Sequence, residues 1–140
     1  MNINEKLTKE QIQNPTYRLL FYKKYGFTEQ AFEDVNVNIR LEAYRSLGFT
    51  ANAFNDNHNL VREEAYRSLG FTEQALSDPD DDIRLEAHRI LGFNETNFND
   101  SSFRIRISAY RQLGFTEQSL NDKDPVIVRE AKKYFKSKRK

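Results

Sequence analysis

The stretch FTEQALSDPDDDIRLEAHRILG, residues 71–92, decides the fold, because its opening phenylalanine and closing glycine recur along the chain. A Gly-Phe pair appears every 22 residues and accounts for all five glycines, at Gly26-Phe27, Gly48-Phe49, Gly70-Phe71, Gly92-Phe93 and Gly114-Phe115. A fixed period in the twenties is typical of a solenoid, in which each unit buries its apolar face only against its neighbours. We therefore expect an all-α solenoid of about six 22-residue repeats.

Two helix starts are visible inside this stretch. Thr72 is a good N-cap for a short helix of about a turn and a half, and Glu73 follows where the helix dipole favours an acid. Asp78 is a second N-cap, with Pro79 at the first helical position, where a missing N–H costs nothing. The longer helix then runs about 12 to 13 residues and ends at Gly92 in a left-handed C′ position.

The same positions recur in the other repeats. The short-helix caps are Thr28, Thr50, Thr72, Asn94 and Thr116, and the long-helix caps are Asp34, Asp56, Asp78, Asp100 and Asp122. Four long helices carry one apolar stripe at i, i+4 and i+8, namely Ile39/Ala43/Leu47, Ile83/Ala87/Leu91, Val61/Ala65/Leu69 and Ile105/Ala109/Leu113. We expect these stripes, with the repeated phenylalanines, to form the core.

The ends of the array depart from this pattern, as capping repeats do. We expect one helical-repeat domain over residues 1–140, with a degenerate N-cap (1–26), regular repeats (27–114), a C-cap (115–136) and a basic tail (132–140). The last nine residues carry six Lys or Arg and no acid, so the preceding 131 sum to −5 against +1 for the chain. The body is therefore mildly acidic and the tail strongly basic.

Composition excludes several classes of protein. No apolar run approaches the roughly 18 residues of a membrane span, and the first residues lack the apolar core of a signal peptide, so we expect no membrane association. The absence of cysteine removes disulfides and thiolate metal sites and fits a reducing cytosol, so we expect a cytoplasmic protein. We find no nucleophile–base constellation, phosphate loop or His/Glu metal motif, and expect neither enzymatic activity nor a cofactor.

The stretch from Asp78 to Ala87, DPDDDIRLEA, resembles the Asp-Pro turn of HEAT-like repeats. The short unit, with a long helix followed by a brief helix that starts at Thr, resembles the leucine-rich repeat variant family over about residues 7–136. The resemblance implies a right-handed superhelix in which α-helices alternate with 3₁₀-type helices. The iron–sulfur cluster of some members is not implied, because this chain has no cysteine.

Two basic columns run through the repeats. The first is Arg40, Arg62, Arg84 and Arg106, with Arg18 as an outlier, and the resemblance implies that it forms ladders with the capping aspartates. Contact with phosphates is the alternative. The second is Lys23, Arg45, Arg67, Arg89, Arg111 and Lys133, which we interpret as a ridge paired with glutamates three residues earlier. Because Ser108 replaces that glutamate before Arg111, Arg111 is expected to be the least neutralised member.

An aromatic column accompanies the arginines, formed by Tyr22, Tyr44, Tyr66, His88 and Tyr110. Three interpretations stay open: packing between repeats, a protein-binding stripe, or a platform on which unpaired bases stack. The acidic run Asp78, Asp80, Asp81 and Asp82 could attract calcium, but it lacks the glycine and closing glutamate of an EF-hand and reads as a solvated helix start.

We hypothesise a non-enzymatic protein-binding module that acts as an adaptor or inhibitor. The alternative is nucleic-acid binding through the Arg/Tyr columns and the basic tail, and self-association is a third hypothesis. Phe103 is an apolar residue at a position that is polar in two other repeats, where it holds Asn59 and Asp81, and it is a candidate anchor. The partner-binding candidates are Tyr44, Arg45, Tyr66, Arg67, His88, Arg89, Phe103, Tyr110, Arg111, Lys136, Lys138 and Arg139.

Overall fold

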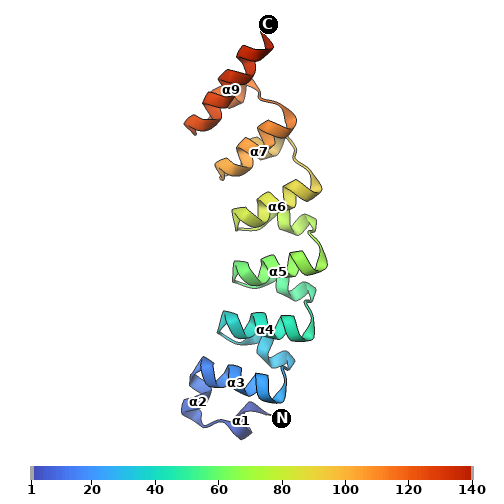
Figure 1. Cartoon of the computed structure of the whole chain (residues 1–140), viewed down its shortest axis with the longest axis vertical. Helices are drawn as coiled ribbons and strands as arrows, with labels where there is room; N and C mark the ends of the chain where they lie inside the picture. The colour runs from blue at the N-terminus through green and yellow to red at the C-terminus, as the bar shows by residue number, and fades with distance from the viewer. Residues whose placement is uncertain (1, 140) are drawn as a thin grey trace. The chain divides into compact units, whose positions relative to one another are not determined.

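The structure, a computed structural model, describes residues 2–139 (Figure 1). Over these residues the chain forms helices and the turns between them, with no β-strand. The all-α prediction is confirmed. The chain divides into two compact units, Met1–Gly70 and Phe71–Lys140.

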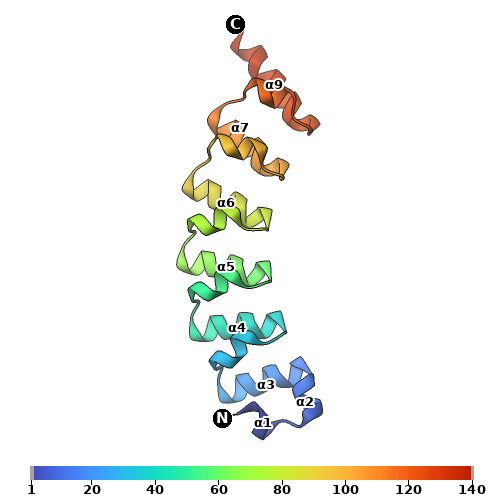
Figure 2. The same cartoon turned by 180° about the vertical axis from the view of Figure 1, so that it is seen from behind.

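In the first unit, long helices lie side by side with short helices between them (Figures 1 and 2). Its elements are α1 (Ile3–Lys6), α2 (Lys9–Gln13), α3 (Pro15–Tyr25), η1 (Glu29–Glu33), α4 (Val37–Leu47), η2 (Ala51–Asn55) and α5 (Asn59–Leu69). The 3₁₀ helix η1 packs on α4 and η2 packs on α5, while α3, α4 and α5 contact one another in chain order.

The second unit repeats this arrangement. Its elements are η3 (Glu73–Ser77), α6 (Asp81–Leu91), η4 (Glu95–Asn99), α7 (Phe103–Leu113), α8 (Glu117–Leu120) and α9 (Pro125–Lys138). The 3₁₀ helix η3 packs on α6, η4 packs on α7, and the short α-helix α8 packs on α9. Four of the short helices are of the 3₁₀ type that the resemblance implied, and the one before α9 is a turn of α-helix.

The long helices begin two residues later than the sequence pattern predicted, so each of α4 to α7 has 11 residues rather than 12 or 13. Asp80, not Asp78, caps α6, because its Oδ1 accepts the N–H groups of Asp82 and Ile83 at 2.9 and 3.2 Å. Asp78 instead ends η3, and its Oδ1 accepts the N–H of Asp80 at 2.8 Å. Aspartate favours both roles, and only the turn geometry distinguishes them.

The threonines stand at the N-cap positions of the short helices, but their side chains make no capping hydrogen bond. The backbone closes these turns itself, as where the Ala75 N–H donates to the Thr72 carbonyl at 3.0 Å. Asn94 differs, because its side chain accepts the Thr96 N–H at 2.9 Å and its own N–H donates to Asn97 Oδ1 at 2.8 Å.

The repeated glycines end the long helices, as predicted, with φ between 100 and 109°. Their ψ values of 142 to 156° differ from the left-handed helical conformation we expected. This combination of positive φ with an extended ψ is populated almost only by glycine, because residues with a Cβ avoid it. The requirement for glycine is therefore stricter than at an ordinary helix C-terminus.

The core differs from prediction at one register position. Ile39 and Ala43 of α4 are buried, but Leu47 is 49% exposed, because it is the last residue of the helix and the chain turns away after it. Tyr44 is buried instead, with its ring stacked on Phe32 at 4.2 Å and on Phe49 at 5.4 Å between centroids. The stacked aromatic rings take the place in the core that we had assigned to the third leucine.

Candidate functional site

The first basic column is a set of anchored ion pairs inside the fold. Arg40 donates from Nε and Nη2 to the two carboxylate oxygens of Asp56 at 2.8 and 2.9 Å, and from Nη1 to the Asp34 carbonyl at 2.9 Å. The Arg40 and Asp56 side chains are only 10% and 7% exposed. The same 16-residue spacing pairs Arg18 with Asp34, Arg84 with Asp100 and Arg106 with Asp122. A guanidinium group whose N–H donors are bonded to a buried carboxylate in this way is not available to bind a phosphate.

The Arg84–Asp100 pair favours the ionised form of its carboxylate. Burial raises the pKa of Asp100, but hydrogen bonds from Arg84 and the Ser102 N–H, with the Arg84 charge, outweigh burial and hold it below its ordinary value. The Asp100 hydrogen bond raises the pKa of Arg84 in turn, against the opposing effect of burial. The Arg84–Asp100 pair is therefore a charged structural element within the fold.

The aromatic column lies in the core and not on a binding surface. Tyr44, Tyr66, His88 and Tyr110 are 4, 0, 4 and 0% exposed. Tyr110 stacks on Phe98 at 4.2 Å and on Phe115 at 5.6 Å, so both ring faces are covered. Burial raises the pKa of the Tyr44 and Tyr110 hydroxyls. These rings offer no surface on which a partner or a base could stack, which corrects their selection as partner-binding residues.

His88 is held by two neutral partners. The Asn97 amide lies 3.1 Å from His88 Nε2, and His88 Nδ1 lies 3.3 Å from the Gly92 carbonyl. With the amide donating to Nε2, the ring carries its proton on Nδ1 and donates it to Gly92. Residues equivalent to Asn97 are alanines where the column holds Tyr22 and Tyr44, so a shorter ring is matched by a longer neighbour.

Replacing Asn97 with alanine is expected to lower the free energy of unfolding by about 1–3 kcal/mol, because the buried His88 nitrogen loses its donor. The double change His88→Tyr with Asn97→Ala recreates the pair used in the first unit and should recover most of the loss. Urea denaturation followed by circular dichroism measures both. A double variant less stable than Asn97→Ala alone would contradict the pairing.

The second basic column is paired both within helices and between them. The predicted pairing with a glutamate three residues earlier occurs at Arg45 with Glu42 (3.5 Å) and at Arg89 with Glu86 (3.7 Å), whereas Arg45 and Arg111 also reach a neighbouring helix. Arg45 of α4 forks onto both carboxylate oxygens of Glu64 in α5, with Nε to Oε2 at 2.9 Å. Arg111 of α7 does the same with Glu130 of α9, at 3.0 and 2.6 Å. The hydrogen bond from Arg111 holds the pKa of Glu130 below its usual value. The prediction that Arg111 is the least neutralised member of the column is therefore wrong.

The residues paired between helices are 19 apart in sequence. The missing glutamate at Ser108 therefore deprives a different arginine of its partner. Ser108 lies 19 residues after Arg89, where the other pairs have a glutamate. Among the described residues Arg89 makes an ion pair only with Glu86 of its own helix, at 3.7 Å. Arg67 pairs with Glu63, one turn earlier, at 2.9 Å. Arg89 is thus the weakly compensated arginine of the ridge.

An exposed leucine closes each of the four regular long helices. We call Leu47, Leu69, Leu91 and Leu113 the leucine row; they are 46 to 50% exposed. Leu47 and Leu69 belong to the first unit, and Leu91 and Leu113 to the second. Ile90, 56% exposed, extends the apolar surface beside Leu91. The sequence pattern does not separate these leucines from the core stripe, because they share its helical register, although their position directly before the glycine marks the helix end.

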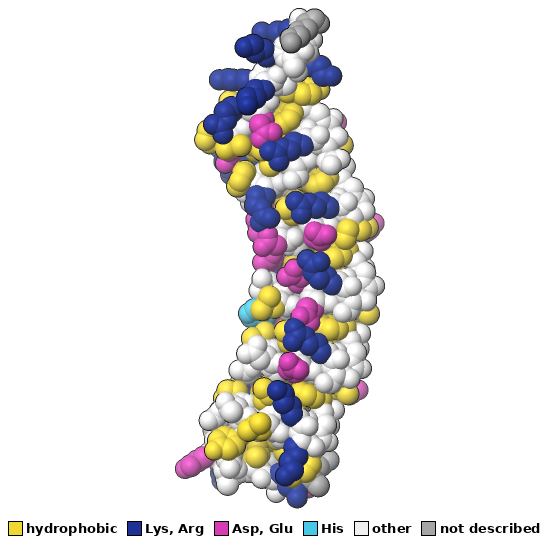
Figure 3. Space-filling model, in the orientation of Figure 1, with side chains coloured by type: hydrophobic (Ala, Val, Ile, Leu, Met, Phe, Trp, Pro, Cys, Tyr) yellow, Lys and Arg dark blue, Asp and Glu magenta, His cyan; other side chains and the backbone are white. Residues whose placement is uncertain are grey.

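Cations gather on α9 and the turn before it. An open groove of about 640 Å³, the α9 groove, is lined by five cations with Asp122, Pro125 and Val128; the cations are Lys123, Arg129, Lys132, Lys133 and Lys136. In Figure 3 the blue side chains around α9 have few magenta neighbours, whereas the two colours alternate over α4 and α5. Lys138 and Arg139 are exposed beyond the groove, and Lys140 lies outside the described residues.

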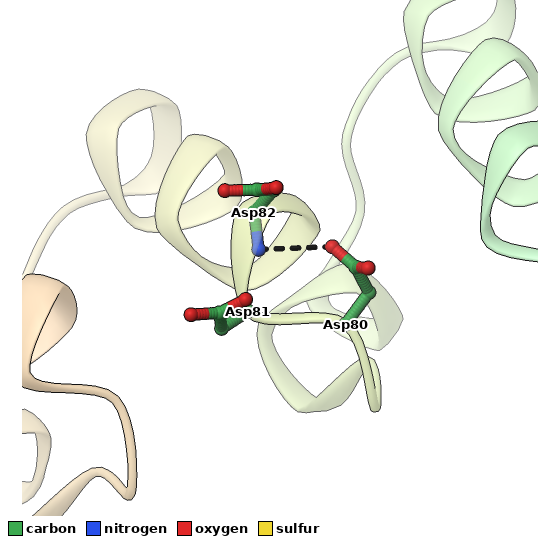
Figure 4. Close-up of side chains that lie close together, drawn as sticks. All are labelled: Asp80, Asp81 and Asp82. Carbon is green, nitrogen blue, oxygen red and sulfur yellow. Dashed lines mark hydrogen bonds between the residues drawn. The ribbon is translucent and has the colours of Figure 1, made fainter.

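The acidic run at the start of α6 brings three carboxylates within 4.8 Å of one another (Figure 4). Each has a structural role: Asp80 caps the helix, Asp81 accepts the Ser102 hydroxyl at 2.9 Å, and Asp82 pairs with Arg104. This agrees with the interpretation as a solvated helix start. Phe103, the predicted anchor, is the first residue of α7 and is 42% exposed.

In the part of the chain that the structure describes, no helix combines the length and apolar character needed to cross a bilayer. Comparisons with known protein families, with characterised proteins and with solved structures give no match for this chain. The resemblance to leucine-rich repeat variant and HEAT-like proteins therefore stays a prediction.

Proposed function

We propose that the chain is a non-enzymatic protein-binding module, an adaptor or inhibitor built as a right-handed α-solenoid of about six 22-residue repeats. The leucine row carries this proposal. Scattered exposed apolar residues are ordinary on proteins, but the row repeats one half-exposed leucine at the same position in four helices. Regular apolar surface rimmed by polar groups is typical of protein–protein contact sites.

The long helices that carry the leucine row also carry paired charges. The Arg45–Glu64 and Arg111–Glu130 pairs satisfy each other across neighbouring helices. Such pairs contribute little to stability where exposed, but they give a partner a surface with no strong net field. Burial of the leucines then supplies the affinity, at about 25 cal/mol per Å² of apolar surface removed from water.

The repeated pairings support the solenoid. The 16-residue Arg–Asp and 19-residue Arg–Glu spacings occur within each unit, so the same contact between consecutive helices is used in both. One contact that recurs between consecutive helices is typical of a solenoid.

Nucleic-acid binding is the second candidate function, and the α9 cations are the observation that favours it. The body of the chain does not add to it, because its arginine columns are paired with Asp and Glu and its tyrosines are covered. The charge available to phosphates is therefore concentrated at α9.

The proposed function is tested by removing the leucine row. We expect the variant with all four row leucines changed to glutamine to lose about tenfold or more in capture of a specific partner from nuclease-treated lysate, since each buried leucine contributes over 1 kcal/mol. The matched control removes four exposed apolar residues outside the row, Leu20→Gln, Val35→Ser, Leu60→Gln and Phe103→Gln.

If capture is lost in the control variant but kept in the leucine-row variant, the leucine row is not the binding surface. That result would instead support Phe103 as the anchor. Capture that disappears after nuclease treatment of the wild-type sample would favour nucleic-acid binding. Circular dichroism of each variant confirms that the helices are retained.

A further inference from the structure

The face of α9 that carries the groove corresponds to a helix-receiving face in the regular repeats. Val128, Arg129 and Lys132 lie 88 residues after Arg40, Leu41 and Tyr44, which is four repeat periods. In α4 these three positions are buried, at 8, 7 and 4% exposure, and Leu41 and Tyr44 pack in one cluster with residues of η2 and α5.

The same face of α7 is filled in the second unit. Ile107 and Tyr110 are 5% and 0% exposed and share a cluster with Ile127 of α9. On α9, by contrast, Arg129 and Lys132 are exposed and Val128 is half-buried. The fold thus presents on α9 a surface whose counterparts on α4 and α7 each receive a helix.

We propose that the α9 groove binds an acidic helical segment of a partner protein. This rests on the proposed function as a protein-binding module, and it assigns a partner chemistry to a surface separate from the leucine row. The groove is lined by the apolar side chains of Pro125 and Val128 together with cations, whose aliphatic stems add apolar surface and whose ammonium and guanidinium groups add positive charge.

The sign of the charge identifies an anionic partner. None of the five lining cations forms an ion pair with a residue in the described part of the chain, and the one lining acid, Asp122, is held by Arg106 at 2.9 and 3.1 Å. A surface that needed only solubility would be served by mixed charges, as on the Arg45–Glu64 ridge. Uncompensated positive charge repels itself, and an acidic partner relieves the repulsion while steering association.

The spacing of the cations favours a helix. Arg129, Lys132, Lys133 and Lys136 follow α9 at one-turn intervals, so they span about 10 Å along its axis. Acidic residues at i, i+3 or i+4, and i+7 of a docked helix have the same spacing. No aromatic side chain lines the groove, so the stacking platform that single-stranded nucleic acids use is missing from its described lining.

The full chain is titrated with a labelled 18-residue helical peptide of glutamate, leucine and alanine, with glutamates at one-turn spacing, by fluorescence anisotropy at about 150 mM salt. The comparison probes are the same peptide with lysine for glutamate, a 20-nucleotide single strand and a 20-base-pair duplex. We expect the acidic peptide to bind most tightly and the lysine peptide not to bind.

The K132E/K136E variant should weaken binding of the acidic peptide at least tenfold, because it reverses two charges in the groove. The control K23E/K24E makes the same charge change on exposed residues of α3 and should leave the affinity within about twofold. Equal losses of peptide affinity in the two variants would show that only the net charge of the chain matters, and would overturn the proposal that the groove is the binding site.

Tighter binding of either DNA than of the acidic peptide, abolished by K132E/K136E, would make the groove a nucleic-acid site and overturn the proposal. The leucine-row variant should bind the peptide as the wild type does. If the acidic peptide does not bind but partner capture still depends on the leucine row, only this inference is overturned. If the peptide binds but capture does not depend on the leucine row, only the proposed function is overturned.

Discussion

Replacing Arg106 with alanine is expected to destabilise the second unit by about 3–5 kcal/mol, the largest effect we predict for an ion pair. Arg106 and Asp122 are only 5% and 6% exposed, and two of the guanidinium N–H groups are committed to the carboxylate. A third donates to the Asp100 carbonyl at 2.9 Å. Removing the side chain leaves a buried carboxylate without its cation and a carbonyl without its donor.

The control for this prediction is Arg104→Ala, two residues away on the same helix. Arg104 also pairs with an aspartate, Asp82, but their side chains are 48% and 62% exposed. An exposed pair contributes at most about 1 kcal/mol, so this variant should unfold close to the wild type in urea. Equal shifts of the urea midpoint in the two variants would mean that burial of the Arg106 pair does not set its contribution.

Replacing Gly70 with valine is expected to cost about 3 kcal/mol, the upper end of the range for a residue forced into a sparsely populated conformation. Gly70 has φ 103° and ψ 146°, where a Cβ and especially a β-branched side chain clash with the local backbone. A Cβ built at this position would meet no other atom within 4 Å, so the cost comes from the backbone and not from crowding. Thermal melting followed by circular dichroism measures the loss.

Two variants test this reasoning. Gly70→Ala adds no branching and should keep most of the cost, because the open surroundings do not penalise size. Ser68→Val places the same valine at an exposed position inside α5 and should leave the stability almost unchanged, because serine and valine have similar helix propensities. A melting temperature of Gly70→Val equal to that of Ser68→Val would show that the chain relaxes into another turn.

The helical elements could be predicted because their signals are local. The spacing of Gly48, Gly70 and Gly92 marks three helix ends, and glycine is needed there for a reason internal to the chain, its positive φ. The Arg–Asp ladder was inferred from the resemblance alone, and the contacts of Arg40 with Asp56 agree with it. Helix starts were displaced by two residues because Asp78 and Asp80 suit both the turn and the cap.

The site could not be predicted in the same way, because exposure depends on what packs against each helix. Leu47 and Tyr44 both lie on the core side of α4, and only the position of the helix end and the stacking of Phe32 and Phe49 make the leucine exposed and the tyrosine buried. Pairing within a helix predicted Arg111 as the weakly compensated arginine, whereas pairing between helices selects Arg89.

The sequence by itself determined the helical class, the period and the glycine turns of this protein, because those follow from backbone preferences and apolar spacing within one repeat. Only the tertiary structure decided which columns are core, which cations are compensated and which face of α9 is open. Those properties depend on contacts with residues 16 or 19 positions away, which lie on another helix. A single repeat contains only one residue of each such pair, so its sequence does not reveal the contact.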